Sequence, residues 1–419
     1  MRKQRRLACA SGAVLLSLVA HAADWPQWRG PLRNGVSAET GLLQEWPKGG
    51  PRLIWQVKNI GYGYAAPSVV GNRIYVLSNR GLDNEFVQAL STVDGKPVWA
   101  TTLGKVGNPE QMPTFPAARS TPTVDGALLY ALGSDGDLAC VRTSDGTIQW
   151  KKNLRADFGG VPGKWAYSES PLVDGDALIV TPGGPQTTIV ALNKKTGATI
   201  WKSAVPGGDD AAYASSIVVE ASGRRQYVQF LAKGLVAVNA KTGEFLWRYD
   251  ATGKGNTNIP SPVASGGYVY TSLSRGPGGL IHLAAAEHAA PEQVYLQRGL
   301  PNSIGGSVVI GATHFGTNSD GLVAADWVTG KVLWQEASAG AGSIAAAGNR
   351  LYIHTEDGDV ILVEATPEAY REKGRFTPPD RPKGARGAME KAWAYPAIAN
   401  GRLYIRELDS LWAYDITGK

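Results

Sequence analysis

A short motif, Thr or Asp followed by Gly and then by Trp four positions later, recurs along this 419-residue chain. Its copies read DGKPVW, DGTIQW, TGATIW, TGEFLW and TGKVLW, and they end at Trp99, Trp150, Trp201, Trp247 and Trp334. An apolar stretch precedes each Gly and a second one leads to the Trp, which predicts two antiparallel strands joined by a tight turn. The glycine is needed because one turn residue must take a positive φ. Internal repetition of this kind restricts the fold to a repeat architecture.

A second shared element lies upstream of each motif. It reads APSVVGNRIYV from Ala66, TPTVDGALLYA from Thr121, SPVASGGYVYT from Ser261 and YPAIANGRLYI from Tyr395. Two apolar runs around a Gly turn predict a β-hairpin. Together the two elements make four antiparallel strands in about 45 residues, which is typical of one propeller blade.

The spacing of the tryptophans counts the blades. Trp55, Trp99, Trp150, Trp201 and Trp247 are separated by 44, 51, 51 and 46 residues, and Trp334 follows after a further 87, which indicates two units with one lost Trp. We expect Tyr295 to occupy the lost position, and the outer strand of the next unit to lie near Arg375-Phe376.

The chain ends at Thr417-Gly418-Lys419, where another copy of the motif should begin. The segment Arg52 to Trp55, RLIW, stands near the start with no blade before it. Joined in space, the two segments restore a complete repeat. The sequence therefore predicts an all-β fold, a single eight-bladed β-propeller over residues 51–419 with four-stranded antiparallel blades, whose last blade is closed by the N-terminal strand.

Residues 1–22 are predicted to be a signal peptide, with a basic start, an apolar run from Leu7 to Ala20, and the small-residue pattern Ala20-His21-Ala22. Residues 23–50 form an N-terminal segment, in which Trp25 and Trp28 are candidates for covering one end of the ring. We expect deletion of this segment to be milder than loss of the closing strand. The predicted location is the periplasm or the outside of the cell, with no membrane insertion.

Charge and metal-ligand patterns exclude several function classes. Removing the four basic residues of the leader from the formal net charge of +6 leaves +2, with no Lys/Arg block, so we expect no nucleic-acid partner. Cys140 is alone in the mature chain and lies in an alternating strand pattern, which predicts a buried core residue. The histidines show no zinc-site spacing. A monomeric ring is the expected assembly.

Eight units with the T-G-x-x-x-W pattern resemble the pyrroloquinoline quinone (PQQ) repeat family of quinoprotein-like propellers. The stretches DWPQWRGPLRNGVS from Asp24 and WAYSESPLVDGDALIVTPGG from Trp165 resemble an exported bacterial subset of that family. The family contains quinone-dependent alcohol dehydrogenases and the propeller lipoprotein of outer-membrane protein assembly. The resemblance implies the fold, with tryptophans docking adjacent blades, but one fold hosts unrelated functions.

The long loops between blades are predicted to share one face, which we take as the functional face. They include Ala100 to Arg119 and Lys151 to Tyr167. Residues that enter the innermost strands should rim the central channel there. The ligand-binding candidates at this rim are Tyr64, Arg119, Trp165, Glu169, Tyr213 and Trp393. An alternative for two of them is a structural ion pair between Glu169 and Arg119.

For the enzymes of the family, the resemblance implies PQQ on a tryptophan platform with a calcium ion bound by oxygens. Calcium takes six or more oxygen ligands. The available oxygens, a weak set, belong to Glu169, Asp209, Asp210, Asn256 and Asn258. The adjacent cysteine pair of many such enzymes is absent, and the chain is shorter than theirs.

The first functional hypothesis is therefore a binding or scaffold module whose partner is a small molecule, a glycan or an envelope protein. The alternative is a PQQ- and calcium-dependent oxidoreductase of an alcohol or sugar. A propeller that acts on polysaccharides through its aromatic channel mouth ranks third. The sequence leaves open whether any catalysis occurs.

Overall fold

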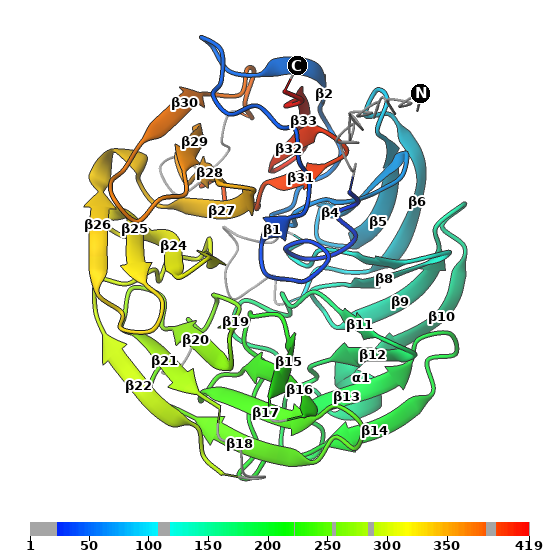
Figure 1. Cartoon of the computed structure of the whole chain (residues 1–419). Coiled ribbons are helices and arrows are strands. Elements are labelled where there is room, and N and C mark those ends of the chain that lie inside the picture. The colour runs from blue at the N-terminus through cyan, green and yellow to red at the C-terminus, as the bar shows by residue number, and fades with distance from the viewer. Residues whose placement is uncertain are drawn as a thin grey trace, which may run out of the picture.

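The computed structural model describes residues 23–107, 118–221, 223–253, 257–283, 289–382 and 391–418. The predicted signal peptide lies outside these residues. Within them the strands form eight sheets arranged around a central axis, so the predicted eight-bladed all-β propeller is confirmed (Figure 1).

Each blade runs from an innermost strand near the axis to an outermost strand at the rim, and neighbouring strands are antiparallel. The first blade consists of β3 (Ser68–Val70), β4 (Arg73–Arg80), β5 (Asn84–Ser91) and β6 (Pro97–Gly104), and the second of β7 (Thr123–Asp125), β8 (Leu128–Leu132), β9 (Asp137–Arg142) and β10 (Ile148–Asn153). The third consists of β11 (Leu172–Asp174), β12 (Ala177–Val180), β13 (Ile189–Asn193) and β14 (Thr199–Ser203), and the fourth of β15 (Ile217–Ala221), β16 (Arg224–Phe230), β17 (Leu235–Asn239) and β18 (Phe245–Tyr249).

The second half of the ring repeats this order. Its blades are β19 (Val263–Ser265), β20 (Tyr268–Ser272), β21 (Gly278–His282) and β22 (Glu292–Gln297); β23 (Ser307–Ile310), β24 (Thr313–Asn318), β25 (Gly321–Asp326) and β26 (Val332–Glu336); β27 (Gly342–Ala347), β28 (Arg350–Thr355), β29 (Val360–Glu364) and β30 (Glu372–Phe376); and β31 (Ala397–Ala399), β32 (Arg402–Glu407), β33 (Ser410–Asp415) and β2 (Arg52–Val57).

Two short helices lie beside the strands in the described residues. Helix α1 (Leu154–Phe158) is capped by the Asn153 side chain, which accepts hydrogen bonds from two backbone N–H groups of the first turn. The 3-10 helix η1 (Ala337–Ala339) follows β26. The predicted loops after Ala100 and Lys151 accordingly begin later than the sequence suggested, because β6 continues to Gly104 and β10 to Asn153.

The last blade is closed by the N-terminal strand, as predicted. Strand β2 pairs antiparallel with β33, with Leu53 opposite Tyr414 and Trp55 opposite Ala413. Arg52 also forms an ion pair with Asp415, with 2.7 Å between Nη2 and Oδ2. Most of the free energy of this seam must come from backbone pairing and from burial of Trp55, since Arg52 is exposed.

The outer-strand tryptophans contact the turn region of the following blade. Trp55, Trp99 and Trp150 donate from Nε1 to the backbone oxygens of Thr92, Thr143 and Lys194, at 2.9, 3.0 and 3.0 Å. The Trp55 ring lies so close to Gly95 that a Cβ there would stand 2.9 Å from Cε3. Glycine in the motif thus provides both the positive φ of the turn and the space for the ring.

Tyr295 stands where the sixth tryptophan is missing. It lies opposite Leu280 in the register of β21 and β22, and its hydroxyl donates to the Trp327 oxygen at 3.2 Å. The expectation that Tyr295 takes the lost position is confirmed, and the degenerate outer strand near Arg375-Phe376 is β30.

In β30 the tryptophan position is held by Gly374, which lies opposite Leu362. Trp46 of the N-terminal segment lies directly against this glycine, since a Cβ at Gly374 would stand 2.7 Å from the Trp46 Cβ. The Trp46 ring lies 5.1 Å from Phe376 and 6.3 Å from Tyr352. A distant segment therefore supplies the indole that this blade lacks.

Residues 23–37 cross the central channel and bond to the innermost part of the ring (Figure 1). Strand β1 (Val36–Ser37) pairs parallel with β27 as a fifth strand of that sheet. Backbone or side-chain hydrogen bonds from this segment and from Glu39 reach seven of the eight blades, at Val69, Val124, Ser170, Ser261, Ser307, Ala346 and Gly401.

The N-terminal segment is thus part of the core rather than an appendage. Trp25, Leu42 and Trp46 are buried in one hydrophobic cluster with residues of the first, seventh and last blades. Removing it would expose that cluster to water, so its deletion should be costly in itself; that it is milder than loss of the closing strand stays a prediction. Cys140 is buried, as predicted.

No helix in the described ranges is long and apolar enough to cross a membrane.

Replacing Trp55 by Ala should lower the free energy of unfolding by roughly 3–5 kcal/mol, the usual range for truncating a buried large aromatic. Chemical denaturation followed by far-UV circular dichroism measures this. Leu53→Ala on the same strand is the matched control, because Leu53 is 37% exposed and should cost less. Equal costs for the two variants would contradict a docking role of Trp55 at the seam.

Trp46→Ala should destabilise the protein by a similar amount, roughly 3–5 kcal/mol, because it empties the space above Gly374. The neighbouring Glu45→Ala, at an exposed position, is its control. A melting temperature unchanged by Trp46→Ala would show that the segment does not support the seventh blade.

Candidate functional site

A pocket of about 230 Å³ opens at the mouth of the central channel. Its walls come from the residues just before the innermost strands of seven blades and from the N-terminal segment that crosses the channel. The lining residues are Trp28, Tyr64, Arg119, Trp165, Ser168, Tyr213, Ile259, Ile304, Trp393 and Tyr395.

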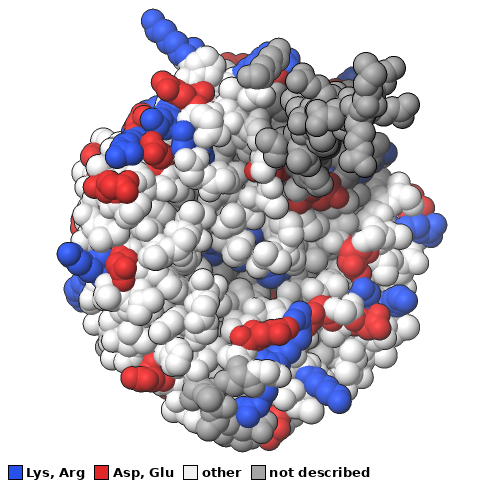
Figure 2. All heavy atoms as spheres, in the orientation of Figure 1, with Lys and Arg blue, Asp and Glu red and all other residues white. Residues whose placement is uncertain are grey.

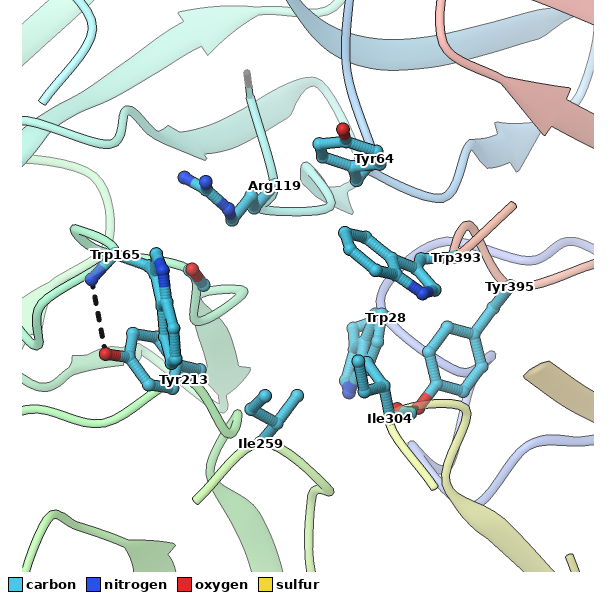
Figure 3. A pocket seen from close by; sticks show the side chains of 10 residues that line it. Trp28, Tyr64, Arg119, Trp165, Tyr213, Ile259, Ile304, Trp393 and Tyr395 are labelled. Atoms are coloured by element: carbon cyan, nitrogen blue, oxygen red, sulfur yellow. Dashed lines mark hydrogen bonds between the residues drawn. The ribbon is translucent and has the colours of Figure 1, made fainter. Parts of the chain in front are cut away.

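Six aromatic side chains dominate this lining and form three pairs. The ring centroids are 5.4 Å apart for Trp165 and Tyr213, and 5.1 Å apart for Tyr64 and Trp393. Trp28 meets Tyr395 edge-on at 4.4 Å. Figure 3 shows the first pair on one side of the pocket and Trp393, Trp28 and Tyr395 on the other.

Hydrogen bonds fix several of these rings. The Trp165 backbone N–H donates to the Tyr213 hydroxyl at 3.2 Å, and the Tyr395 hydroxyl donates to the Ile304 oxygen at 2.8 Å. Trp28 donates from Nε1 to the Ser261 hydroxyl at 3.2 Å. Rigid aromatic walls with partly exposed faces are suited to holding a flat or apolar group, because little rotamer freedom is lost on binding.

Arg119 is the one charged residue in the described lining. It stands at one edge of the pocket, near Tyr64 (Figure 3). Burial lowers the pKa of the Arg119 guanidinium, while Tyr64 and the carboxylate of Glu85 oppose that change. Glu85 is itself held by Ser134, whose hydroxyl donates to Oε2 at 2.7 Å.

Glu169, the remaining rim candidate, does not line the pocket. Its carboxylate is buried and accepts hydrogen bonds from the Thr181 backbone N–H and from Gln229 Nε2. Burial raises the pKa of Glu169 to about 7, and the positive charge that opposes this is that of Arg33. Glu169 therefore interacts with Thr181, Gln229 and Arg33 rather than with Arg119, so the alternative of an ion pair between Glu169 and Arg119 is wrong.

The family model described as outer membrane protein assembly factor BamB matches residues 36–161 and 83–336, which together span more than half of the chain. The chain belongs to this family of PQQ-like propellers.

Relatives in sequence are distant. BamB of Burkholderia pseudomallei is 25% identical over 338 residues, covering 70% of this chain and 82% of that protein. BamB of Alkalilimnicola ehrlichii is 29% identical over 33% of this chain and 32% of its own length. Tetrathionate hydrolase of Acidithiobacillus ferrooxidans is 25% identical over 61% of this chain and 52% of its own length.

Solved structures share the fold. BamB from Moraxella catarrhalis has a TM-score of 0.61 at 14% identity, over 88% of this chain and 98% of that one. The quinohemoprotein alcohol dehydrogenase ADHIIG from Pseudomonas putida HK5 has a TM-score of 0.68 at 14% identity, over 95% and 81%. At these identities the likeness concerns the architecture alone.

The described residues of this BamB-family propeller do not fit a quinone–calcium site. Asp209 is buried in an ion pair with Arg248 and caps the Lys233 N–H, and the Asn258 side-chain amide donates to the Leu231 oxygen at 2.6 Å. Glu169 is held by Thr181 and Gln229, as described above. The side chain of Asp210 is exposed, and Asn256 lies outside the described residues. Within those ranges no three His, Cys, Asp or Glu side chains gather as metal ligands.

Sequence reasoning located Tyr64, Arg119, Trp165, Tyr213 and Trp393 in the lining and missed the other five members. Tyr395 begins one of the recognised hairpin elements and Ile259 lies two positions before another, so alignment of the repeats could have found them. Trp28 belongs to no repeat, and only the path of the N-terminal segment brings it to the pocket.

Glu169, buried beside the pocket, predicts a pH dependence of stability. Because its pKa is about 7 in the folded protein and its usual value is 4.5, the folded state keeps a proton between those pH values that the unfolded chain has lost. Its contribution to the free energy of unfolding should therefore fall as pH rises from about 4.5 to 7. Glu169→Gln removes this dependence. Relative to wild type, the variant should gain about 1–3 kcal/mol of stability on going from pH 5 to pH 8.

Urea denaturation at both pH values measures the difference. The exposed Glu45→Gln serves as the control. Parallel stability curves for wild type and Glu169→Gln would show that the carboxylate is not held protonated by burial.

Proposed function

We propose that this protein is an envelope binding module that holds a ligand, or a segment of a partner protein, in the aromatic pocket at its channel mouth. The observation that carries the proposal is the pocket lining: six aromatic side chains around an open space with no carboxylate among the described residues. Concave, mostly apolar pockets with a few polar groups are the usual ligand sites of proteins. Membership of the BamB family, whose name denotes outer-membrane protein assembly, supports a role in the envelope.

From the predicted signal peptide we propose that this activity takes place in the periplasm or outside the cell, and we propose that the ring acts as a monomer. A PQQ- and calcium-dependent dehydrogenase is the less favoured function. Its requirements for a calcium site and a general base find no support in the described lining.

The test compares melting temperatures of wild type, Trp165→Ala and Trp393→Ala with a panel of probes: PQQ with and without calcium, a neutral oligosaccharide, and flat naphthalene derivatives. A probe that binds the native state raises the melting temperature by mass action. At least one flat probe should stabilise wild type and fail to stabilise both variants. The variants themselves should melt close to wild type, because both rings are partly exposed.

Two results would contradict the proposal. If Trp165→Ala and Trp393→Ala both unfold many degrees lower and no probe distinguishes them from wild type, the rings serve packing. Saturable PQQ binding that requires calcium, together with dye-linked oxidation of an alcohol, would favour the dehydrogenase instead.

A further inference from the structure

The backbone nitrogen of Ala23 lies beside the carboxylate of Glu39. Its N–H donates to Glu39 Oε1 at 3.3 Å, and the Gly401 N–H donates to Oε2 at 2.8 Å. Ala23 and Glu39 are 16 positions apart, so this contact closes a loop of the N-terminal segment. Ala23 is also the first residue after the predicted cleavage pattern Ala20-His21-Ala22. The chain end that cleavage is expected to create therefore lies against a carboxylate.

Cleavage changes the chemical nature of this nitrogen. Hydrolysis of the Ala22–Ala23 peptide bond consumes one water molecule and yields a carboxylate on Ala22 and an amine on Ala23. The ordinary pKa of an α-amino group is about 8, so the amine takes up a proton and is mostly an ammonium at pH 7. In the uncleaved chain the same atom is a neutral amide nitrogen with one N–H. Processing therefore turns a neutral donor beside Glu39 into a cation.

The carboxylate of Glu39 is buried, with 4% of the residue exposed. Burial raises its pKa, and the groups that oppose this change are the backbone N–H groups of Gly401, Ala23 and Asn400. No Lys or Arg of the described ranges takes part. Because a buried carboxylate without a cation costs free energy even when it is hydrogen-bonded, Glu39 occupies a place that a cation would stabilise.

The neighbouring strands bring tyrosines to Glu39 and direct their arginines elsewhere. Burial raises the pKa of Tyr352 on β28 and of Tyr404 on β32, and the charge of Glu39 adds to both changes. Arg350 and Arg402 on the same strands donate to backbone oxygens. Figure 2 shows Lys and Arg interspersed with Asp and Glu around the rim of the face that β1 crosses, and its described part carries no dense basic patch. The described surroundings of Glu39 thus supply donors but no neutralising charge.

The first and last blades hold the chain end in position. The Asn400 N–H donates to the Ala23 oxygen at 3.3 Å, and the Gly71 N–H donates to Asp24 Oδ1 at 2.9 Å. These bonds do not use the Ala23 nitrogen, so they persist after cleavage and keep the new ammonium group beside Glu39.

We propose that removal of the leader creates an ion pair, between the new α-ammonium group of Ala23 and the buried carboxylate of Glu39, that fixes the N-terminal segment in the ring. The pair joins the two ends of a loop that contains β1 and Trp28, a residue of the pocket lining. Processing for export therefore stabilises the segment that completes both the core and the pocket.

Insertion of Gly-Ser between Ala22 and Ala23 tests the pair on the exported protein. The leader and its cleavage pattern stay intact, but the ammonium moves two residues away and the Ala23 nitrogen is an amide again. N-terminal sequencing checks both chain ends, and urea denaturation at pH 7 compares the two proteins. The unfolding equilibrium constant of the extended protein should be roughly tenfold larger, because a hydrogen bond between two charged groups is stronger than one from a neutral amide.

Glu39→Gln separates the effect of charge from that of added length. The substitution keeps a hydrogen-bond acceptor and removes the negative charge, so in this background the insertion should change the unfolding equilibrium constant by about twofold or less. The exposed Glu45→Gln is the matched control and should retain the full effect of the insertion. An equal loss of stability with Glu39 and with Gln at this position would show a steric effect of the extra residues and overturn the inference.

The reactivity of the α-amino group gives a second readout, which needs no variant. Only the unprotonated amine reacts with acetic anhydride, and the pair holds the proton on the nitrogen. Mass spectrometry of the N-terminal peptide gives the acetylation rate against pH for the native protein and for the same protein unfolded in urea. The midpoint should lie about one pH unit higher in the native protein. Burial alone would instead disfavour the charged amine and lower the midpoint.

Three results overturn the inference: a mature chain that begins elsewhere than at Ala23, an insertion that leaves stability unchanged, or a native midpoint that is not raised. If neither variant folds, the midpoint alone decides. None of these results bears on probe binding in the aromatic pocket, so the function proposed above holds or fails independently.

Discussion

The backbone pairing of β2 with β33 is the interaction on which the ring depends. In seven blades the four blade strands follow one another in the chain, and β27 adds β1 as a fifth. The last blade alone draws its outer strand from the opposite terminus. Without it, β33 would present an unpaired edge and the flanking blades would expose apolar faces, which is a known route to aggregation.

The N-terminal segment extends this closure into the centre of the molecule. The same segment that leads into β2 supplies Trp46 to the blade with the missing indole, adds β1 to β27, and brings Arg29, Arg33 and Trp28 into the channel. Ring closure and construction of the pocket are therefore linked, because the pocket is incomplete until the segment that closes the ring is in place. Burying the guanidinium groups of Arg29 and Arg33 in the channel costs desolvation free energy, and hydrogen bonds to carbonyl oxygens offset only part of that cost.

The periodicity of the chain made most of the fold predictable. Gly95 and Trp55 illustrate the reason: one glycine provides both the turn and the space for the ring, and Gly146, Gly197 and Gly243 repeat this arrangement against Trp99, Trp150 and Trp201. Tyr295 was predictable because register is preserved when one aromatic replaces another. Trp46 was not, because nothing in the sequence near it shows that Gly374 leaves a space some three hundred residues later.

The candidate site was also predictable only where the repeats determine the position of a residue. Tyr64, Arg119, Tyr213 and Trp393 were found because the repeats align them at the entry to the innermost strands. Glu169 occupies an equivalent position yet turns into the protein, where Thr181 and Gln229 bind it. Alignment gives the position of a Cα atom along the strand, whereas the direction of the side chain depends on which partner is available. Trp28 follows no repeat, so only the three-dimensional path of its segment reveals it.

The pairing of Arg52 with Asp415 joins residues 363 positions apart. Strand β2 is synthesised among the first elements, but its partner β33 is synthesised near the end of the chain. Strand β2 therefore stays unpaired while the blades between the two strands form. Contacts of such long sequence separation are slow to form, since the entropy of closing the loop is lost before the contact is gained. Joining of the two chain ends should therefore be the late step of folding, after the blades between them have formed.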